Sequence, residues 1–302
     1  MSDVSTLTYA QSVVLGALQG VTELFPISSL GHSVLVPAWI GGAWQQLVTE
    51  GDSKNGTPFL AFIVALHVAT ALALLWFYWR DWVDVIGAFF TTLRTRRIET
   101  SSQKLAWMII IATTPVGILG LALDKPLREL FAKPLAAAIF LTINGVVLAT
   151  VEVLRRRSAA LAESRPSWDD PHHDREITSL SLPEAGGIGA LQTFALFAGI
   201  SRSGVTIVGG LLRGLNHEDA AKFAFMLATP VILAAGMLKI PELLGPQGHG
   251  IHGQIIVGAI VAFVAAFVSV KFLTKFFTTK TLTPFAIYCV VAGIASVIRF
   301  AV

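Results

Sequence analysis

Long apolar runs separated by short polar loops make up most of the chain. A helix needs about 20 apolar residues to cross a bilayer. Six runs approach or reach that length and are predicted to be transmembrane helices: 59–79, 105–123, 135–154, 220–237, 255–276 and 282–302. Because lipid offers the backbone no hydrogen-bond partner, such spans have to be helical, so the pattern predicts an all-α polytopic membrane protein.

Two further apolar stretches are interrupted near their middle. Residues 9–40 break at the Pro-Ile-Ser of 26–28, and residues 182–212 break at the Ile-Ser of 200–201. Each half is too short to span a bilayer. Both stretches are therefore predicted to be re-entrant helix hairpins, whose breaks are covered by protein or face a water-filled cavity.

The two broken stretches also resemble each other in sequence. Residues 16–19 (GALQ) recur at 189–192, and at the same offset of 173 residues both breaks read Ile-Ser, with a glycine three residues later. Each hairpin is followed by three predicted spans, an odd number that inverts the second half relative to the first. We therefore predict two inverted-topology repeats, 1–154 and 182–302, an architecture that transporters use to build a site near the bilayer midplane.

Composition agrees with this pattern. Hydrophobic residues form 54% of the chain and charged residues 14%, with a mean hydropathy of +0.70, which excludes an ordinary soluble domain. The N-terminus has neither a basic segment nor a cleavage site, so we expect no signal peptide. A single cysteine, Cys289, rules out an internal disulfide.

The placement of basic residues predicts the orientation. They gather after residue 79, after residue 154, around 213–222 and around 275–280. Cytoplasmic loops carry such an excess, so these loops are predicted to be cytoplasmic. The first hairpin then opens to the outside and the second to the cytoplasm.

Two polar or amphipathic segments lie between the apolar runs. Residues 155–181 are predicted to be a mobile cytoplasmic linker. The His172-His173 pair within it is interpreted as solvated rather than as a metal site. Residues 81–93 are amphipathic and predicted to form an interfacial helix.

Polar side chains inside apolar surroundings concentrate at the two breaks. Helix N-termini there offer unpaired N–H groups to an anion, and phosphate is their common guest. Ser28 and Ser201 are also good N-caps, and capping alone is the alternative role for these serines. Arg202 would cost roughly 2.5–3.5 kcal/mol at the bilayer centre unless it has a partner or a function. Its planar fork fits phosphate oxygens, while a structural ion pair with Glu23 is the alternative.

Glu23 lies four residues after Gln19, on one helical face. A carboxylate and an amide oxygen beside phosphate are a partial ligand set for Mg²⁺ or Ca²⁺. His32, close to the first break, is suited to proton transfer or nucleophilic attack. His67 and His217 are expected to be satisfied core histidines. The residues alone thus predict a membrane-embedded site for a phosphorylated, lipid-like substrate.

Two motifs resemble those of a known family. The first is Gln19-x-x-x-Glu23 followed by PISSLGH at 26–32, and the second is AGISRSGVT at 198–206. The chain resembles the undecaprenyl-diphosphate phosphatase family, integral-membrane enzymes linked to bacitracin resistance, nearly from end to end. It departs from the family at Ala198, where a proline is usual, and in the greater length of segment 155–181.

The resemblance implies hydrolysis of undecaprenyl diphosphate to undecaprenyl phosphate and inorganic phosphate, which recycles the lipid carrier for peptidoglycan synthesis. It implies a multi-pass protein of the bacterial inner membrane, with a site open to the periplasmic face and a Mg²⁺ or Ca²⁺ ion held by Gln19 and Glu23. The implied catalytic residues are His32, Glu23, Arg202 and Ser29. The implied substrate-binding residues are Ser28, Ser201, Ser203, Gly204 and Thr206.

Some alternatives stay open. The nucleophile is His32, Ser29 or water. A different class of protein, an inverted-repeat transporter or flippase of polyprenyl phosphate, fits the same repeats, and phosphate release by the purified protein separates the two. The expected partners are the polyprenyl diphosphate and the bilayer, with no nucleic acid; a homodimer is compatible with the sequence.

Overall fold

The computed structural model describes residues 7–49, 58–123, 133–163, 175–244 and 250–301. In this part of the chain every named element is a helix. The first half contains α1 (Tyr9–Thr22), α2 (Ser29–Ile40), α3 (Ala43–Thr49), α4 (Pro58–Phe77), α5 (Trp79–Thr95), α6 (Ser101–Ala122) and α8 (Pro134–Glu163). The second half contains η3 (Ile177–Ser179), α9 (Leu182–Leu191), η4 (Gln192–Leu196), α10 (Arg202–Leu212), α11 (His217–Leu244), α12 (His252–Phe276) and α13 (Thr283–Ala301).

Five of the predicted spans are helices long and apolar enough to cross a membrane, namely α6, α8, α11, α12 and α13. The sixth, 59–79, corresponds to α4, which continues after one residue into α5 at a bend of 85°. Counted as one broken span, α4 and α5 bring the number within the described residues to six. The chain is a multi-pass, all-helical membrane protein, as predicted.

The segment 155–181 differs from its prediction as a mobile linker. Helix α8 continues through Arg155 to Glu163, and η3 and the N-cap of α9 follow within the same segment. Arginine, alanine and leucine are good helix formers, so a cluster of arginines ends the apolar span without ending the helix. Arg156 also bonds to Thr283 on α13, which ties this extension to the bundle. The His172-His173 pair lies outside the described residues.

Both predicted hairpins have a helix–break–helix form. The second break is longer than expected: after α9 the chain forms the 3₁₀ helix η4, and regular structure resumes only at α10. The bend uses Gly199, whose φ of 109° favours glycine. The Cβ of any other residue would also lie 2.4 Å from the carbonyl oxygen of Ala137.

The two hairpins share local details. Helix α1 begins with a capping box of Thr8 and Gln11, and α9 begins with one of Ser181 and Glu184. Within α1, Gly16 lies so close to α12 that a Cβ there would be 2.5 Å from a backbone oxygen. Gly189 of α9 approaches α6 even more closely, since a Cβ there would be 2.1 Å from the Ala112 carbonyl oxygen. Both details, the capping box and the close glycine, recur at the sequence offset of 173 residues.

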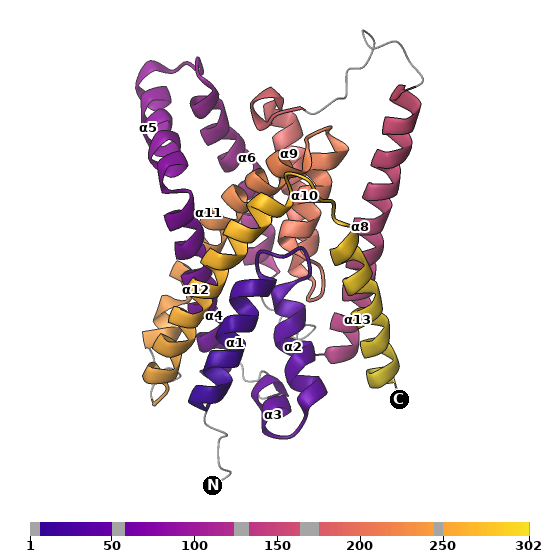
Figure 1. Ribbon diagram of the computed structural model, residues 1–302. Helices are drawn as coiled ribbons and strands as arrows, with labels where there is room; N and C mark the ends of the chain where they lie inside the picture. Colours follow the sequence, from indigo (N-terminus) through magenta and orange to yellow (C-terminus); the bar gives the residue numbers. More distant parts are fainter. Residues whose placement is uncertain (1–6, 50–57, 124–132, 164–174, 245–249, 302) are drawn as a thin grey trace.

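The helix packing places the hairpins inside the bundle. Helix α1 packs against α12 and α9 against α6, while α8 pairs with α13 and α4 with α11. Figure 1 shows α1 and α2 entering from the end at which both termini lie, and α9 and α10 from the opposite end. The two breaks therefore meet in the interior.

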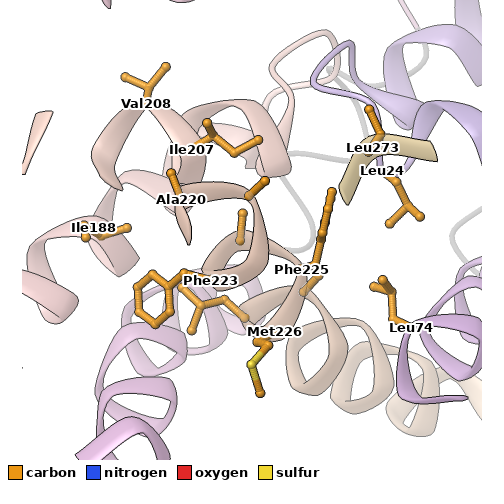
Figure 2. Close-up of a cluster of buried hydrophobic side chains, with 14 of the residues drawn as sticks. Leu24, Leu74, Ile188, Ile207, Val208, Ala220, Phe223, Phe225, Met226 and Leu273 are labelled. Atoms are coloured by element: carbon orange, nitrogen blue, oxygen red, sulfur yellow. The ribbon is translucent and has the colours of Figure 1, made fainter. Parts of the chain in front are cut away.

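The core of the bundle is built around α11. Phe223, Phe225 and Met226 of this helix are fully buried and pack with Ile207, Leu74 and other side chains from both halves (Figure 2). Helix α12, in contrast, exposes an apolar stripe at four-residue spacing, formed by Ile256, Ile260, Val264 and Val268. Such a stripe suits contact with lipid tails. Leu24, Ile27 and Ala198, which lie at the two breaks, belong to the same core cluster, so the breaks are buried away from lipid.

Candidate active site

The first break is held by Ser28, which caps α2. Its hydroxyl oxygen accepts a hydrogen bond from the N–H of Gly31 at 3.2 Å and a second from the N–H of Gly199 at 3.1 Å. Ser28 has a φ of 73°, which is unusual for a residue other than glycine. Such a conformation persists only where the surroundings enforce it. Here one hydroxyl group serves both hairpins at once.

The second break is capped in the same way. The Ser201 hydroxyl accepts from the N–H of Gly204 at 3.1 Å and lies 3.0 Å from the Ser203 hydroxyl. Asn144 of α8 joins the two breaks, because its amide donates to the Pro26 carbonyl and accepts from the Ser201 N–H, each at 3.0 Å. Sequence reasoning missed Asn144, whose role depends on two distant backbone groups.

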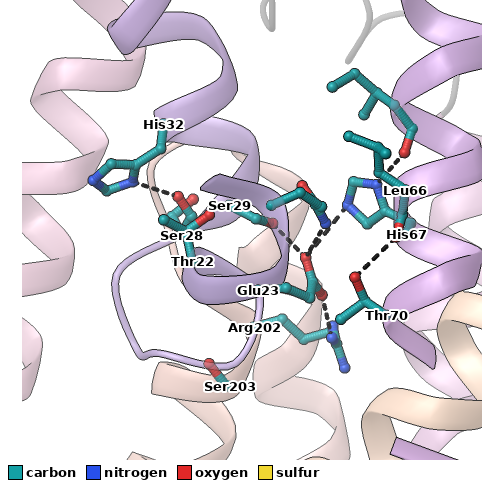
Figure 3. A network of polar contacts seen from close by, with 12 residues as sticks. Thr22, Glu23, Ser28, Ser29, His32, Leu66, His67, Thr70, Arg202 and Ser203 are labelled. Carbon is teal, nitrogen blue, oxygen red and sulfur yellow. Dashed lines mark hydrogen bonds and ion pairs between the residues drawn. The ribbon is translucent and has the colours of Figure 1, made fainter. Parts of the chain in front are cut away.

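Glu23 is the centre of a buried polar cluster, the Glu23 cluster, shown in Figure 3. Arg202 donates from Nη2 to one carboxylate oxygen of Glu23 at 2.5 Å. The other oxygen accepts from the Ser29 hydroxyl and from Nε2 of Gln19 at 3.1 Å. Nε2 of His67 on α4 lies 3.4 Å from that same oxygen. The cluster thus joins both hairpins and the first long helix.

Two atoms of the Glu23 cluster are buried without a hydrogen-bond partner among the described residues. They are Oε1 of Gln19, a free acceptor, and Nη1 of Arg202, a free donor. Buried polar atoms are nearly always paired, so each such atom calls for an explanation. A metal–phosphate ligand would satisfy both atoms, because the Gln19 oxygen could bind the metal ion and the Arg202 nitrogen could donate to a phosphate oxygen.

His32 does not join this cluster. Its Nδ1 lies 2.7 Å from the Ser28 carbonyl and its Nε2 lies 2.7 Å from the hydroxyl of Tyr288. Since a carbonyl only accepts, Nδ1 donates to Ser28 and Tyr288 donates to Nε2. In Figure 3 the His32 ring points away from Glu23 and Arg202. Tyr288 of α13, like Asn144, was not singled out from the sequence.

Apart from His32, the predicted site residues fall into two groups. The structure brings Gln19, Glu23, Ser29 and Arg202 into direct contact. A second group of hydroxyls makes hydrogen bonds within and between the two hairpin tips, namely those of Ser28, Ser201, Ser203 and Thr206. The Thr206 hydroxyl, for example, donates to the carbonyl of Arg202. The Arg202–Glu23 ion pair foreseen as an alternative is present.

The two histidines expected in the core behave differently. His217 is satisfied as predicted, by Glu152 at 2.7 Å and by Arg155 at 3.0 Å. His67 instead faces the Glu23 cluster, so its interpretation as a core residue is wrong. The sequence did contain a signal for a role in the site, namely the polar imidazole of His67 in the middle of the otherwise apolar span 59–79.

Comparison with known proteins identifies the family of the chain. The family model described as "Bacitracin resistance protein BacA" matches residues 12–295. The chain is 56% identical over 301 residues to the "Undecaprenyl-diphosphatase" of Mycolicibacterium paratuberculosis, with 98% of each chain covered. It is 55% identical over 339 residues to the "Undecaprenyl-diphosphatase 2" of Frankia alni, covering 98% of this chain and 99% of the relative. From the match over nearly all of its length, the chain belongs to the bacitracin resistance protein BacA family.

Proposed function

We propose that the protein is a membrane-embedded phosphatase that hydrolyses undecaprenyl diphosphate to undecaprenyl phosphate and inorganic phosphate. The reaction would return the lipid carrier to peptidoglycan synthesis and confer bacitracin resistance. The observation that carries the proposal is Arg202, partly buried where the two hairpins meet, with Nη2 on Glu23 and a buried Nη1 without a partner among the described residues. The names of relatives that are more than half identical support the same reaction.

The diphosphate is proposed to bind between the N-termini of α2 and α10. Both helices start at the meeting point, at Ser29 and Arg202 respectively. Helix N-termini carry a partial positive charge and unpaired N–H groups, and Arg202 adds a planar, permanently charged fork. The caps Ser28 and Ser201, with Ser203, Gly204 and Thr206, are proposed to shape this phosphate site.

Gln19 and Glu23 are proposed to hold a divalent cation, Mg²⁺ or Ca²⁺. The unpartnered Oε1 of Gln19 and the carboxylate of Glu23 are oxygen donors, which these hard cations prefer. When bound, the ion would neutralise charge on the phosphate oxygens. In the absence of the ion, Arg202 neutralises the Glu23 carboxylate. Substrate phosphate would compete with Glu23 for Arg202 and so free the carboxylate to bind the ion.

The contacts favour Ser29, or a water molecule in its place, as the group that attacks the terminal phosphorus and displaces undecaprenyl phosphate. Attack by water would give inorganic phosphate directly, whereas attack by Ser29 would leave a phosphoserine that water then hydrolyses. The Ser29 hydroxyl donates to Glu23, so its proton already points at a carboxylate that can accept it. His32 is less available, since Nε2 already accepts the Tyr288 hydroxyl. Arg202 is proposed to hold the phosphate in line for attack and to stabilise its developing charge.

Two inverted repeats, 1–154 and 182–302, are proposed as the architecture. The shared capping boxes and the close glycine contacts of α1 with α12 and of α9 with α6 support them. Figure 1 adds that the arginine-bearing ends of α5 and α8 lie opposite the termini, as positive-inside orientation requires. The first hairpin, and with it the substrate entry, would then face the periplasm. A homodimer remains compatible with this arrangement.

Phosphate release by the detergent-purified chain tests the proposal. The substrate is a prenyl diphosphate, supplied with and without Mg²⁺ or Ca²⁺, and Arg202→Ala is compared with Arg94→Ala, an exposed arginine at the end of α5. Release that needs the metal and Arg202, and does not need Arg94, supports a phosphatase. Absence of release from folded protein that binds the lipid would overturn it in favour of lipid transport.

A further inference from the structure

His67 is the member of the Glu23 cluster to which the proposed reaction assigns no role. Its Nδ1 lies 2.8 Å from the carbonyl oxygen of Ile63, one turn earlier in α4. A carbonyl only accepts hydrogen bonds, so Nδ1 carries a hydrogen and donates it. In the neutral ring Nε2 then has a free lone pair, and this atom faces Glu23 (Figure 3).

The contact between His67 and Glu23 is longer than an ordinary hydrogen bond. Nε2 lies 3.4 Å from Oε2, whereas N–H···O bonds span about 2.7–3.2 Å. Oε2 already accepts from Ser29 and Gln19. A lone pair and a carboxylate oxygen repel each other at this distance unless positive charge lies with them. The Arg202 guanidinium on the other carboxylate oxygen offsets part of this repulsion, and a proton on the imidazole or a metal ion bound by both atoms would remove the rest.

We propose that Nε2 of His67 is a third ligand of the divalent cation held by Gln19 and Glu23; the inference rests on the proposed function for the presence of that ion. Oε1 of Gln19 is buried and unpartnered among the described residues, on an amide whose nitrogen contacts the same Glu23 oxygen. Donation from the other ring nitrogen to a backbone carbonyl is the usual support of a metal-binding histidine, and His67 has it.

This donor set changes the metal that the site prefers. The described residues contain no group of three or more His, Cys, Asp or Glu side chains able to hold a metal. The proposed set instead combines one carboxylate, one amide and one imidazole. Mg²⁺ and Ca²⁺ favour oxygen ligands alone, while a nitrogen ligand raises affinity for first-row transition metals. The site is therefore expected to bind Mn²⁺ more tightly than Mg²⁺.

Calorimetric titration of Mn²⁺ and of Mg²⁺ into the detergent-purified full chain, without substrate, tests this inference. The variants are His67→Ala and His67→Gln, with His217→Gln as the control, because His217 is also a partly buried histidine and bonds to Glu152 and Arg155 outside the cluster. Loss of a ligand should weaken Mn²⁺ binding at least 10-fold in His67→Ala. His67→Gln should keep an oxygen donor and lose the preference for Mn²⁺ over Mg²⁺. His217→Gln should bind both ions like the parent chain.

The direction of the change in Mn²⁺ affinity distinguishes a metal-binding His67 from a His67 that only balances the charge of Glu23. If His67 were an imidazolium balancing Glu23, its removal would leave Mn²⁺ binding unchanged or tighter, and either result overturns the inference. Absence of Mn²⁺ binding by the parent chain overturns it as well. Phosphate release is measured in parallel to distinguish the two proposals. Hydrolysis with unchanged Mn²⁺ binding in both His67 variants would refute only the role of His67 as a metal ligand. Mn²⁺ binding by a parent chain that releases no phosphate would refute only the phosphatase activity.

Discussion

Replacement of Arg202 by lysine tests whether a forked cation, and not only a positive charge, is required. Nη2 contacts Glu23 while Nη1 is buried and free among the described residues, so the guanidinium can hold a carboxylate or phosphate oxygen with each nitrogen. Lysine keeps the charge but offers a compact ammonium that cannot make both contacts in a fixed plane. A hydrogen bond to a charged group contributes about 1.5–3 kcal/mol.

At about 1.4 kcal/mol for each factor of ten in rate, loss of one such contact in the transition state predicts a decrease in kcat/KM of about 10- to 150-fold. The assay is initial-rate phosphate release over a range of substrate concentrations. Arg175→Lys is the matched control, because Arg175 makes a two-contact pair with Glu184 at 2.9 and 3.2 Å outside the cluster. A kcat/KM near that of the parent chain in Arg202→Lys would refute direct binding of phosphate by the Arg202 fork.

Four further predictions have distinct expected outcomes. Ser29→Ala should reduce hydrolysis more than His32→Ala, since Ser29 bonds to Glu23 and His32 does not; the reverse order in a phosphate-release assay would contradict this. Glu23→Gln should raise the metal concentration needed for half-maximal activity, and an unchanged metal dependence would remove Glu23 from the ligand set. Asn144→Leu leaves the buried Ser201 N–H unpaired, at about 1–3 kcal/mol, and the Pro26 carbonyl with only a 3.9 Å contact from the Cys289 thiol, so the melting temperature of the variant in detergent should fall clearly; an unchanged value would contradict the link. Replacing 165–173 with a Gly-Ser linker of equal length should leave hydrolysis intact, and an inactive protein would show that this segment contributes.

The sequence predicted elements whose signals are local. Apolar length alone located α6, α12 and α13 to within a few residues, because a helix in lipid must satisfy its own backbone. The start of α11 was located equally well, but this helix continues to Leu244, beyond its predicted end at residue 237. Loss of local apolar character also located both breaks. The end of α8 was mispredicted, because the helix continues to Glu163 beyond the charged residues at which the predicted span ends. Charge marks where a span leaves the membrane, while helix propensity influences where the helix stops.

The site was only partly predictable. Gln19 and Glu23 share a helical face, so their proximity follows from spacing alone. The ion pair between Glu23 and Arg202 could be anticipated because a buried charge needs a partner. The orientation of His32 could not, since it is set by Tyr288, 256 residues away, and neither could the position of His67, which depends on how α4 packs beside α1.

Glu23 and Arg202 come from different hairpins, and this division constrains the catalytic cycle. Each carries a buried charge that would be costly alone, so each stabilises the other when the site holds no ligand. A cation alone would compete with Arg202 for Glu23, and a phosphate alone would compete with Glu23 for Arg202. A metal–diphosphate ligand satisfies both charges together, with the cation on Glu23 and the phosphate on Arg202. The cluster should therefore bind a cation alone measurably and a metal–diphosphate more tightly, which couples metal binding to substrate binding through contacts already present in the fold.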